Sequence, residues 1–131
     1  MNLLLDTQTL LWWHGGHRKL GPRARQAIEQ GAASVVVSAV TGWEIAIKSS
    51  SGRLRLRQAV DAWMVGVLDG SGFGVLNVTM AHAVAVAGLP PHHGDPFDRL
   101  LIVQAQIEDL TIATADAAFD AYDVKILDAR A

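Results

Sequence analysis

The sequence predicts an α/β fold, a three-layer α/β/α sandwich whose central, mostly parallel sheet has five strands. Five short apolar runs alternate with longer segments in which apolar residues recur at helical spacing. Strands separated by helices in this way favour a parallel sheet with helices packed on both faces. The chain has 131 residues, enough for one hydrophobic core and too few for two. We therefore expect residues 1–131 to form a single domain.

The first half of the chain contains two of the predicted strands. Both are short runs rich in Leu or Val, and the segments between and after them have helical periodicity. Glycine follows each of the first two helices and marks their ends. The predicted elements are a strand at 2–5, helices at 7–14 and 23–30 with Pro22 in the first turn of the second, a strand at 34–38, and helices at 40–50 and 58–69.

The second half contains the other three strands, and helix caps mark several of its boundaries. Thr79 and Asp95 are suitable N-caps, and Pro96 suits the first position of the helix after Asp95. The predicted elements are a strand at 74–78, a helix to about residue 87, a loop at 89–94, a helix to about residue 108, a strand at 110–114, a short helix at 117–121 and a strand at 123–127.

Composition excludes several classes of site. The chain contains no cysteine, so it forms no disulfide, thiolate zinc site or thiol nucleophile, and a reducing compartment fits. The first residues lack a basic region, and Asp6 interrupts their apolar stretch, which is not the pattern of a signal peptide. No apolar run approaches the length of a membrane span. We expect a soluble, cytoplasmic protein with no membrane partner.

The net charge of −2 hides an asymmetry between the two halves of the chain. Residues 1–60 hold eight basic and three acidic residues, whereas residues 61–131 hold three basic and ten acidic ones. A basic stretch in the first half could contact a polyanion although the whole chain is acidic. Solvated helix faces explain any single one of these bases equally well.

Four acidic residues near the ends of apolar runs form a candidate site. If the runs are neighbouring parallel strands, their carboxyl ends meet at one edge of the sheet, where α/β folds place their ligand sites. Carboxylates gathered there repel one another unless they are protonated or bind a hard cation such as Mg²⁺ or Mn²⁺. The pattern indicates metal-dependent chemistry on phosphate esters. The four residues are Asp6, Glu44, Asp98 and Asp116.

Each of these acids also has an ordinary structural explanation. Asp6 and Asp116 stand where predicted helices begin and could serve as N-caps. Asp98 lies in a first helical turn, where an acid is stabilised by the helix dipole, and Glu44 could face the solvent. The conjunction of all four at one predicted edge favours a metal site, which could hold one ion or two ions about 4 Å apart.

Four segments around the acids carry a family resemblance. They are LLLDTQTLLWW, SAVTGWEIAIK, HHGDPFDRLLIVQA and LTIATAD. In these segments the chain resembles the PIN domains, and most closely the VapC-like toxins of type II toxin–antitoxin systems. The resemblance extends from residue 2 to about residue 127.

The resemblance implies a PIN fold and a metal-dependent ribonuclease that hydrolyses RNA phosphodiester bonds with an activated water. It assigns Asp6, Glu44, Asp98 and Asp116 as both catalytic residues and ligands of Mg²⁺ or Mn²⁺. Asp95 is then the helix cap rather than a ligand. The resemblance also implies an antitoxin partner and a homodimer.

Several residues beside the acids are weaker candidates for contact with substrate. Hydroxyl groups there could hold metal-bound waters or serve only in packing and capping, and Lys48 lies one helical turn beyond Glu44. Basic residues could neutralise phosphate charge or pair with the acids. A loop histidine could contact the scissile phosphate or be merely solvated. The candidates are Thr7, Ser38, Lys48, His93, Arg99 and Thr114.

The four tryptophans divide into expected core and expected surface. We predict that Trp43 and Trp63 belong to the core. Trp12 and Trp13 are adjacent on one helix and cannot both face inward. An exposed tryptophan often marks a partner surface, so this pair is a candidate contact for the antitoxin.

Three other functions remain open at the level of the sequence. The chain could be a housekeeping or DNA-directed nuclease of the same fold. It could instead be a receiver-like signalling domain that binds Mg²⁺, although Asp6 is a lone acid and no aspartate ends the run at 34–38. A non-catalytic partner-binding domain is disfavoured by the complete set of acids.

Overall fold

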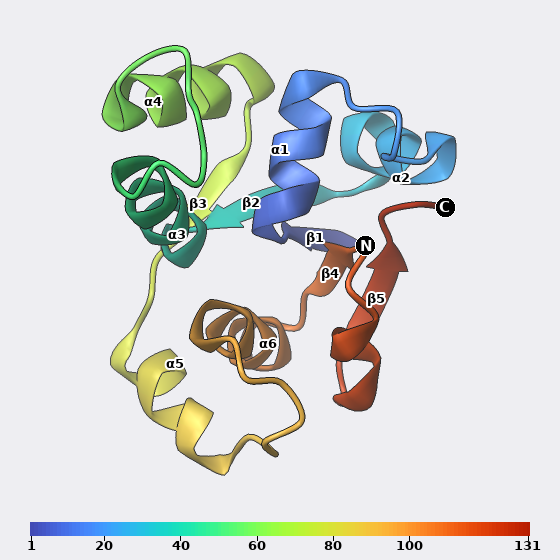
Figure 1. The fold of residues 1–131 in the computed structure, drawn as a ribbon. Helices are drawn as coiled ribbons and strands as arrows, with labels where there is room; N and C mark the ends of the chain where they lie inside the picture. The colour runs from blue at the N-terminus through green and yellow to red at the C-terminus, as the bar shows by residue number, and fades with distance from the viewer.

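A computed structural model describes all of residues 1–131 and contains one parallel sheet of five strands (Figure 1). The predicted α/β architecture is confirmed, and every strand pair is parallel. The strands are β1 (Asn2–Leu5), β2 (Ser34–Ser38), β3 (Gly74–Leu76), β4 (Thr111–Thr114) and β5 (Lys125–Asp128).

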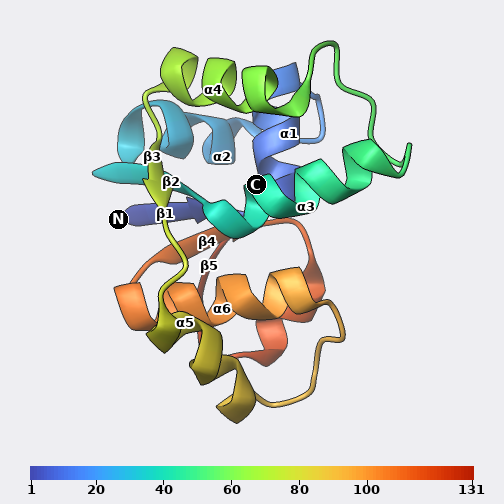
Figure 2. The same cartoon turned by 90° about the vertical axis from the view of Figure 1, so that its left-hand side faces the viewer.

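Helices connect the strands and cover both faces of the sheet. In Figures 1 and 2, α1, α2 and α4 lie on one side of the sheet, and α5 and α6 lie on the other. The α-helices are α1 (Thr7–Gly15), α2 (Pro22–Gln26), α3 (Ala39–Ser50), α4 (Val60–Ser71), α5 (Met80–Ala85) and α6 (Pro96–Glu108). Shorter turns are the π-helix η1 (Ala27–Gly31) and the 3₁₀-helices η2 (Val86–Gly88) and η3 (Ala117–Ala121). No helix is long and apolar enough to cross a membrane.

Two hydrophobic cores form because successive side chains of a strand point to opposite faces of the sheet. Leu3 and Leu5 of β1 pack under α1 and α4, whereas Leu4 packs against α6 on the other face. All three leucines are fully buried. Strand β1 therefore reads as a continuous apolar run, as expected for a central parallel strand covered on both faces.

The strand order is β3-β2-β1-β4-β5, so the direction of strand addition reverses at β1. Ligand sites of open α/β sheets lie at such a switch point, beyond the carboxyl ends of the strands. Here the switch falls between β1 and β4, which are followed by Asp6 and Asp116. Receiver domains have the order 2-1-3-4-5. The observed order therefore excludes the receiver-like alternative.

A chain of buried polar groups joins the sheet to α6. Ser38 ends β2, caps α3 by accepting from the amide of Val40, and donates to Oε1 of Gln104 at 2.6 Å. The Gln104 amide in turn donates to the carbonyl of Asn77 at 3.3 Å. These contacts help to fix α6, whose first turn contributes to the site.

Candidate metal centre

The four predicted acids line one cavity at the carboxyl ends of β1 and β4. Its volume is about 310 Å³, and Asp6, Glu44, Asp98 and Asp116 all contribute to its wall together with Asp95. They come from the ends of two strands and from the early turns of α3 and α6. The carboxylates therefore meet although the sequence separates the first from the last by more than a hundred residues.

Asp6 is a buried acid that is held by hydrogen bonds to both oxygens. It caps α1 by accepting from the amide of Thr9 at 2.8 Å, and Thr114 Oγ1 donates to its Oδ2 at 2.6 Å. Only 6% of the residue is exposed, and burial raises the pKa of its carboxyl despite these hydrogen bonds. Asp6 therefore caps α1 through one carboxylate oxygen, as expected, and takes part in the site through the other, which is directed to β4.

Glu44 is 5% exposed and does not face the solvent. The Ser38 cap starts α3 directly after β2, and Glu44 in its second turn is turned toward α1. Thr7 Oγ1 donates to Glu44 Oε1 at 2.6 Å, and Lys48 Nζ forms an ion pair with Oε2. The carboxylate is therefore oriented on one side by a hydroxyl and on the other by an ammonium group.

Asp95 and Asp98 have different surroundings within the same helical turn. Asp95 caps α6, since its Oδ1 accepts from the amide of Asp98 at 3.0 Å. The Asp98 carboxylate is half-buried beside the other acids. Burial, reinforced by the negative charges of Asp95 and Asp6, raises the pKa of Asp98 to about 7.

His93 lies between Asp98 and Asp116. Its Nε2 is 3.0 Å from Oδ2 of Asp98 and 3.3 Å from Oδ2 of Asp116. Its Nδ1 accepts from the amide of Asp95 at 3.2 Å, which assigns the ring proton to Nε2 in the neutral tautomer. One ligand atom from each of His93, Asp98 and Asp116 lies within 4.8 Å of the others.

Two of the three hydroxyl residues proposed from the sequence, Thr7 and Thr114, orient the acids. Thr7 donates to Glu44, and Thr114 donates to Asp6 and accepts from the amide of Asp116 at 3.0 Å. Ser38 is fully buried and turned to Gln104, so it does not line the cavity. The three hydroxyls thus bind protein groups.

Arg99 lies elsewhere than the sequence suggested. Instead of standing beside the acids, its guanidinium donates to the carbonyls of Pro90 at 2.9 Å and Leu89 at 3.1 Å. It also contacts the carbonyls of Val86 and His93. The reason is helical rotation, since adjacent residues of α6 point about 100° apart and only Asp98 can face the cavity. Arg99 holds the loop that positions His93.

Sequence reasoning missed Arg53 as a residue of the site. Arg53 follows α3 and lines the acid cavity. Its signal in the sequence is an alternation, Arg-Leu-Arg-Leu-Arg at 53–57, in which both leucines are partly buried and all three arginines are exposed. Lys48, which the sequence did suggest, also lines the cavity but is paired with Glu44.

The tryptophans require a correction. Trp63 is 6% exposed and belongs to the core, as predicted, but Trp43 is 59% exposed and packs edge-to-face against Phe97. The prediction for Trp43 was wrong because Glu44 and Ile45 occupy the inward face of α3. Trp12 is buried, and Trp13 is partly buried against Phe73. Neither of the two is strongly exposed.

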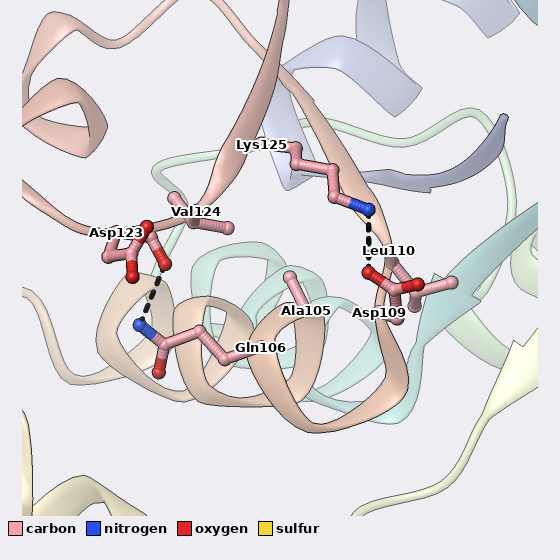
Figure 3. A pocket seen from close by; sticks show the side chains of 7 residues that line it. All are labelled: Ala105, Gln106, Asp109, Leu110, Asp123, Val124 and Lys125. Carbon is pink, nitrogen blue, oxygen red and sulfur yellow. Dashed lines mark hydrogen bonds and ion pairs between the residues drawn. The ribbon is translucent and has the colours of Figure 1, made fainter.

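A second hollow lies at the opposite end of the sheet (Figure 3). It is bordered by Asp109 and Leu110 before β4 and by Val124 and Lys125 at the start of β5. Lys125 pairs with Asp109, and Gln106 donates to the carbonyl of Asp123. Its single cation is thus paired, and it lies at the amino ends of the strands, away from the switch point.

The residues of the acid cavity fit a hard divalent cation. The donors that line it are carboxylate oxygens, which Mg²⁺ or Mn²⁺ accepts as ligands. Lys48 and His93 contact these acids, and the pKa of Asp98 is raised first by burial and then by the negative charges of its neighbours. Asp6, Glu44, Asp98 and Asp116 are the residues that would hold such an ion, and the protonated Nε2 of His93 contacts two of them.

Comparison with known proteins gives a family and several structural relatives. The PIN domain pattern matches residues 3–125. The structure is similar to the Rickettsia felis VapBC2 complex bound to a promoter DNA fragment, with a TM-score of 0.72 and 13% identity over 97% of this chain and 98% of the other. No curated protein matches the chain at a significant level.

Two further solved structures share the fold. FitAcB from Neisseria gonorrhoeae has a TM-score of 0.65 and 22% identity, with 96% of each chain covered. A toxin–antitoxin complex from Klebsiella pneumoniae has a TM-score of 0.64 and 16% identity, again with 96% of each chain covered. At these identities the likeness concerns the fold.

Proposed function

Because this chain belongs to the PIN domain family, we propose that it is a metal-dependent endoribonuclease formed from one PIN domain over residues 1–131. The observation that carries this proposal is the convergence of Asp6, Glu44, Asp98 and Asp116 on one cavity at the switch point of the sheet. Such a set of carboxylates is suited to a divalent cation, which when bound activates a water molecule. Hydrolysis by water is therefore the chemistry that fits.

The residues of the cavity have different roles in the proposed reaction. Asp6, held at both oxygens, and Asp98 and Asp116, which both contact His93, would hold Mg²⁺ or Mn²⁺ together with Glu44. When bound, such an ion lowers the pKa of a water and offsets negative charge on the phosphate. Glu44 is buried and oriented by Thr7, which suits it to position the attacking water. Hydrolysis would form a bond between the water oxygen and phosphorus and break the bond from phosphorus to the leaving oxygen. The proton that the water releases is balanced by the proton that the leaving oxygen takes up.

The biological setting that we propose is that of a toxin with a cognate antitoxin. The support is the likeness to chains from VapBC, FitAcB and toxin–antitoxin complexes, each matched over nearly its whole length. An antitoxin would inhibit the enzyme by binding the surface around α1 and the cavity. Of the two tryptophans suggested by the sequence, Trp13 is partly buried and remains a candidate contact, whereas Trp12 is buried in the core. A homodimer and a cytoplasmic location belong to the same proposal.

A nuclease directed at DNA is the alternative within the same family. Purified protein incubated with RNA and with DNA, in Mg²⁺, Mn²⁺ or EDTA, separates the two. We expect cleavage of RNA that EDTA and Asp6→Asn abolish. Asp69→Asn is the control, because Asp69 is an exposed acid of α4 that does not line the cavity. Cleavage that survives chelation would contradict the metal, and a preference for DNA would contradict the substrate.

A further inference from the structure

Residues 53–57, Arg-Leu-Arg-Leu-Arg, form an unusual surface between α3 and α4, which we call the basic segment. Leu54 and Leu56 pack against the core that includes Leu10 and Trp63. Arg53, Arg55 and Arg57 are all exposed. The leucines anchor the segment, and the anchoring directs three positive charges outward within five residues.

The basic segment runs from the acid cavity into a neighbouring hollow. Arg53 and Leu54 line the acid cavity, whereas Leu54, Arg55 and Arg57 line the hollow, whose volume is about 440 Å³. Leu11 of α1 also borders both. The two depressions are therefore contiguous, and the segment follows one side of the joined groove.

The three arginines make no ion pair within the chain. The other bases near the site are already engaged, since Lys48 pairs with Glu44 and Arg99 binds backbone carbonyls. The basic segment thus carries free positive charge on the side of the cavity toward the neighbouring hollow. Elsewhere Arg130 lies over the Trp12 ring, 5.8 Å from its centroid, and lines a separate hollow with Asp6 and Asp116.

A phosphodiester that enters the acid cavity is repelled by its carboxylates. A bound cation offsets this repulsion at one phosphate only, so the neighbouring phosphates need other positive charges. The basic segment supplies them at the mouth of the cavity. The wall of the neighbouring hollow also contains Leu11, Leu56 and Trp63, and this apolar surface suits an unstacked base.

We propose that the basic segment binds the phosphate backbone of single-stranded RNA next to the bond that is cut, with a neighbouring base against the apolar wall of the hollow. A duplex does not fit this arrangement, because its bases remain stacked and paired. The proposal rests on the proposed nuclease function, but the test below measures binding and is independent of cleavage.

The test compares two triple variants for binding of fluorescein-labelled oligouridine in EDTA, over a series of KCl concentrations. Arg53→Gln/Arg55→Gln/Arg57→Gln removes the charges of the segment. Arg18→Gln/Lys19→Gln/Arg23→Gln removes three equally exposed, unpaired charges that line neither depression. Each phosphate contact to a single strand contributes about 0.7 to the slope of log K against log salt. We therefore expect the first variant to reduce the slope by about 2 and the control to leave it unchanged.

Further variants in the same binding assay distinguish the possible outcomes. Arg→Lys replacement at the same three positions should preserve most of the slope, and Arg55→Gln alone should reduce it by about 0.7. An unchanged slope in the triple variant, or no RNA binding by the wild type at any salt concentration, would overturn the proposal. If the triple variant loses polyglutamate binding to the same extent as RNA binding, the segment is a binding site for an acidic protein instead, which also overturns the proposal. If the slope falls as expected but RNA is not cleaved in Mg²⁺ or Mn²⁺, only the proposed enzyme function fails.

Discussion

Thr114 at the end of β4 donates a 2.6 Å hydrogen bond to the carboxylate of Asp6 at the end of β1, across 108 positions of sequence. Both residues are buried. The same hydroxyl accepts from the amide of Asp116. One threonine therefore sets the positions of two acids of the site relative to each other.

Replacing Thr114 with Val should destabilise the protein, because it leaves a buried oxygen of Asp6 and the amide of Asp116 without partners. A buried polar group that loses its partner costs about 1–3 kcal/mol. Thr114→Ser keeps the hydroxyl and should cost less. Urea unfolding in EDTA measures both variants, and equal stability of Thr114→Val and wild type would show that the hydrogen bond contributes nothing.

The metal-free protein should lose stability as the pH rises from about 4 to 7. The pKa of Asp98 is raised from 3.8 to about 7 by burial and by neighbouring acids, so the folded state holds a proton that the unfolded chain has released. This contribution is fully present below pH 3.8 and is lost as the pH passes 7. Asp6, whose pKa is also raised, acts in the same direction.

Asp98→Asn should remove part of this pH dependence and make the metal-free protein more stable than wild type at pH 8. Mg²⁺ should stabilise the wild type more at pH 8 than at pH 6, because the ionised carboxylate binds the cation. Thermal unfolding at both pH values, with Mg²⁺ and with EDTA, checks these expectations. A wild-type protein that is more stable at pH 7 than at pH 5 in EDTA, and equally so after Asp98→Asn, would contradict them.

Substitutions of Asp95 and Asp98 should have different effects, although both residues lie in one helical turn. Asp95→Ala removes the cap of α6 and should cost about 1 kcal/mol, whereas Asp95→Asn retains a capping oxygen and should cost little. If the proposed nuclease activity is present, Asp98→Asn should abolish it and Asp95→Asn should preserve most of it. The reverse order of activities would make Asp95 the ligand.

Trp43 and Trp63 should differ strongly in their contribution to stability. Trp63 is 6% exposed, and truncation of such a side chain to Ala costs about 3–5 kcal/mol. Trp43 is 59% exposed and contacts mainly Phe97, so Trp43→Ala should cost no more than about 1 kcal/mol. Chemical denaturation of the two variants provides the comparison, and similar losses would contradict the placement of Trp43.

Gly21→Ala should destabilise the end of the chain. A Cβ at Gly21 would lie 2.0 Å from the carbonyl oxygen of Ala131, a contact that backbone displacement alone can relieve. Overpacking of this kind costs about 1–3 kcal/mol. Gly66→Ala is the matched control, since nothing lies near its Cβ and Ala favours a helix interior by about 0.5–1 kcal/mol. Stabilisation by both substitutions would show that the chain end adapts without cost.

The fold was largely predictable because local signals and the global architecture agree. Asp95 and Pro96 marked the start of α6, and the apolar run at 2–5 is a strand with both faces covered. Strand β3 ends at Leu76, two residues earlier than predicted, because Asn77 turns away to bond with Gln104. Such tertiary contacts leave no local signal in the sequence.

The acidic residues of the site were predictable from the sequence, but the orientations of its side chains were less so. Four carboxylates at strand and helix ends were sufficient to indicate the cavity. The rotation of α3, which buries Glu44 and exposes Trp43, depends on packing against α1 and α6. The bridging position of His93 depends on a loop held by Arg99. These features arise from contacts between distant segments, which periodicity does not encode.

The central position of β1 determines when the site comes into being as the chain is synthesised. Strand β1 and Asp6 emerge from the ribosome first, but their partner β4 and Asp116 come more than a hundred residues later. A nascent chain that ends before residue 111 lacks Asp116, and one side of its central strand has no partner. Because long-range pairing of this kind is slow, assembly is expected to follow release of nearly the whole chain. If the proposed ribonuclease activity is present, a growing polypeptide therefore cannot cut the message that encodes it until translation is almost complete.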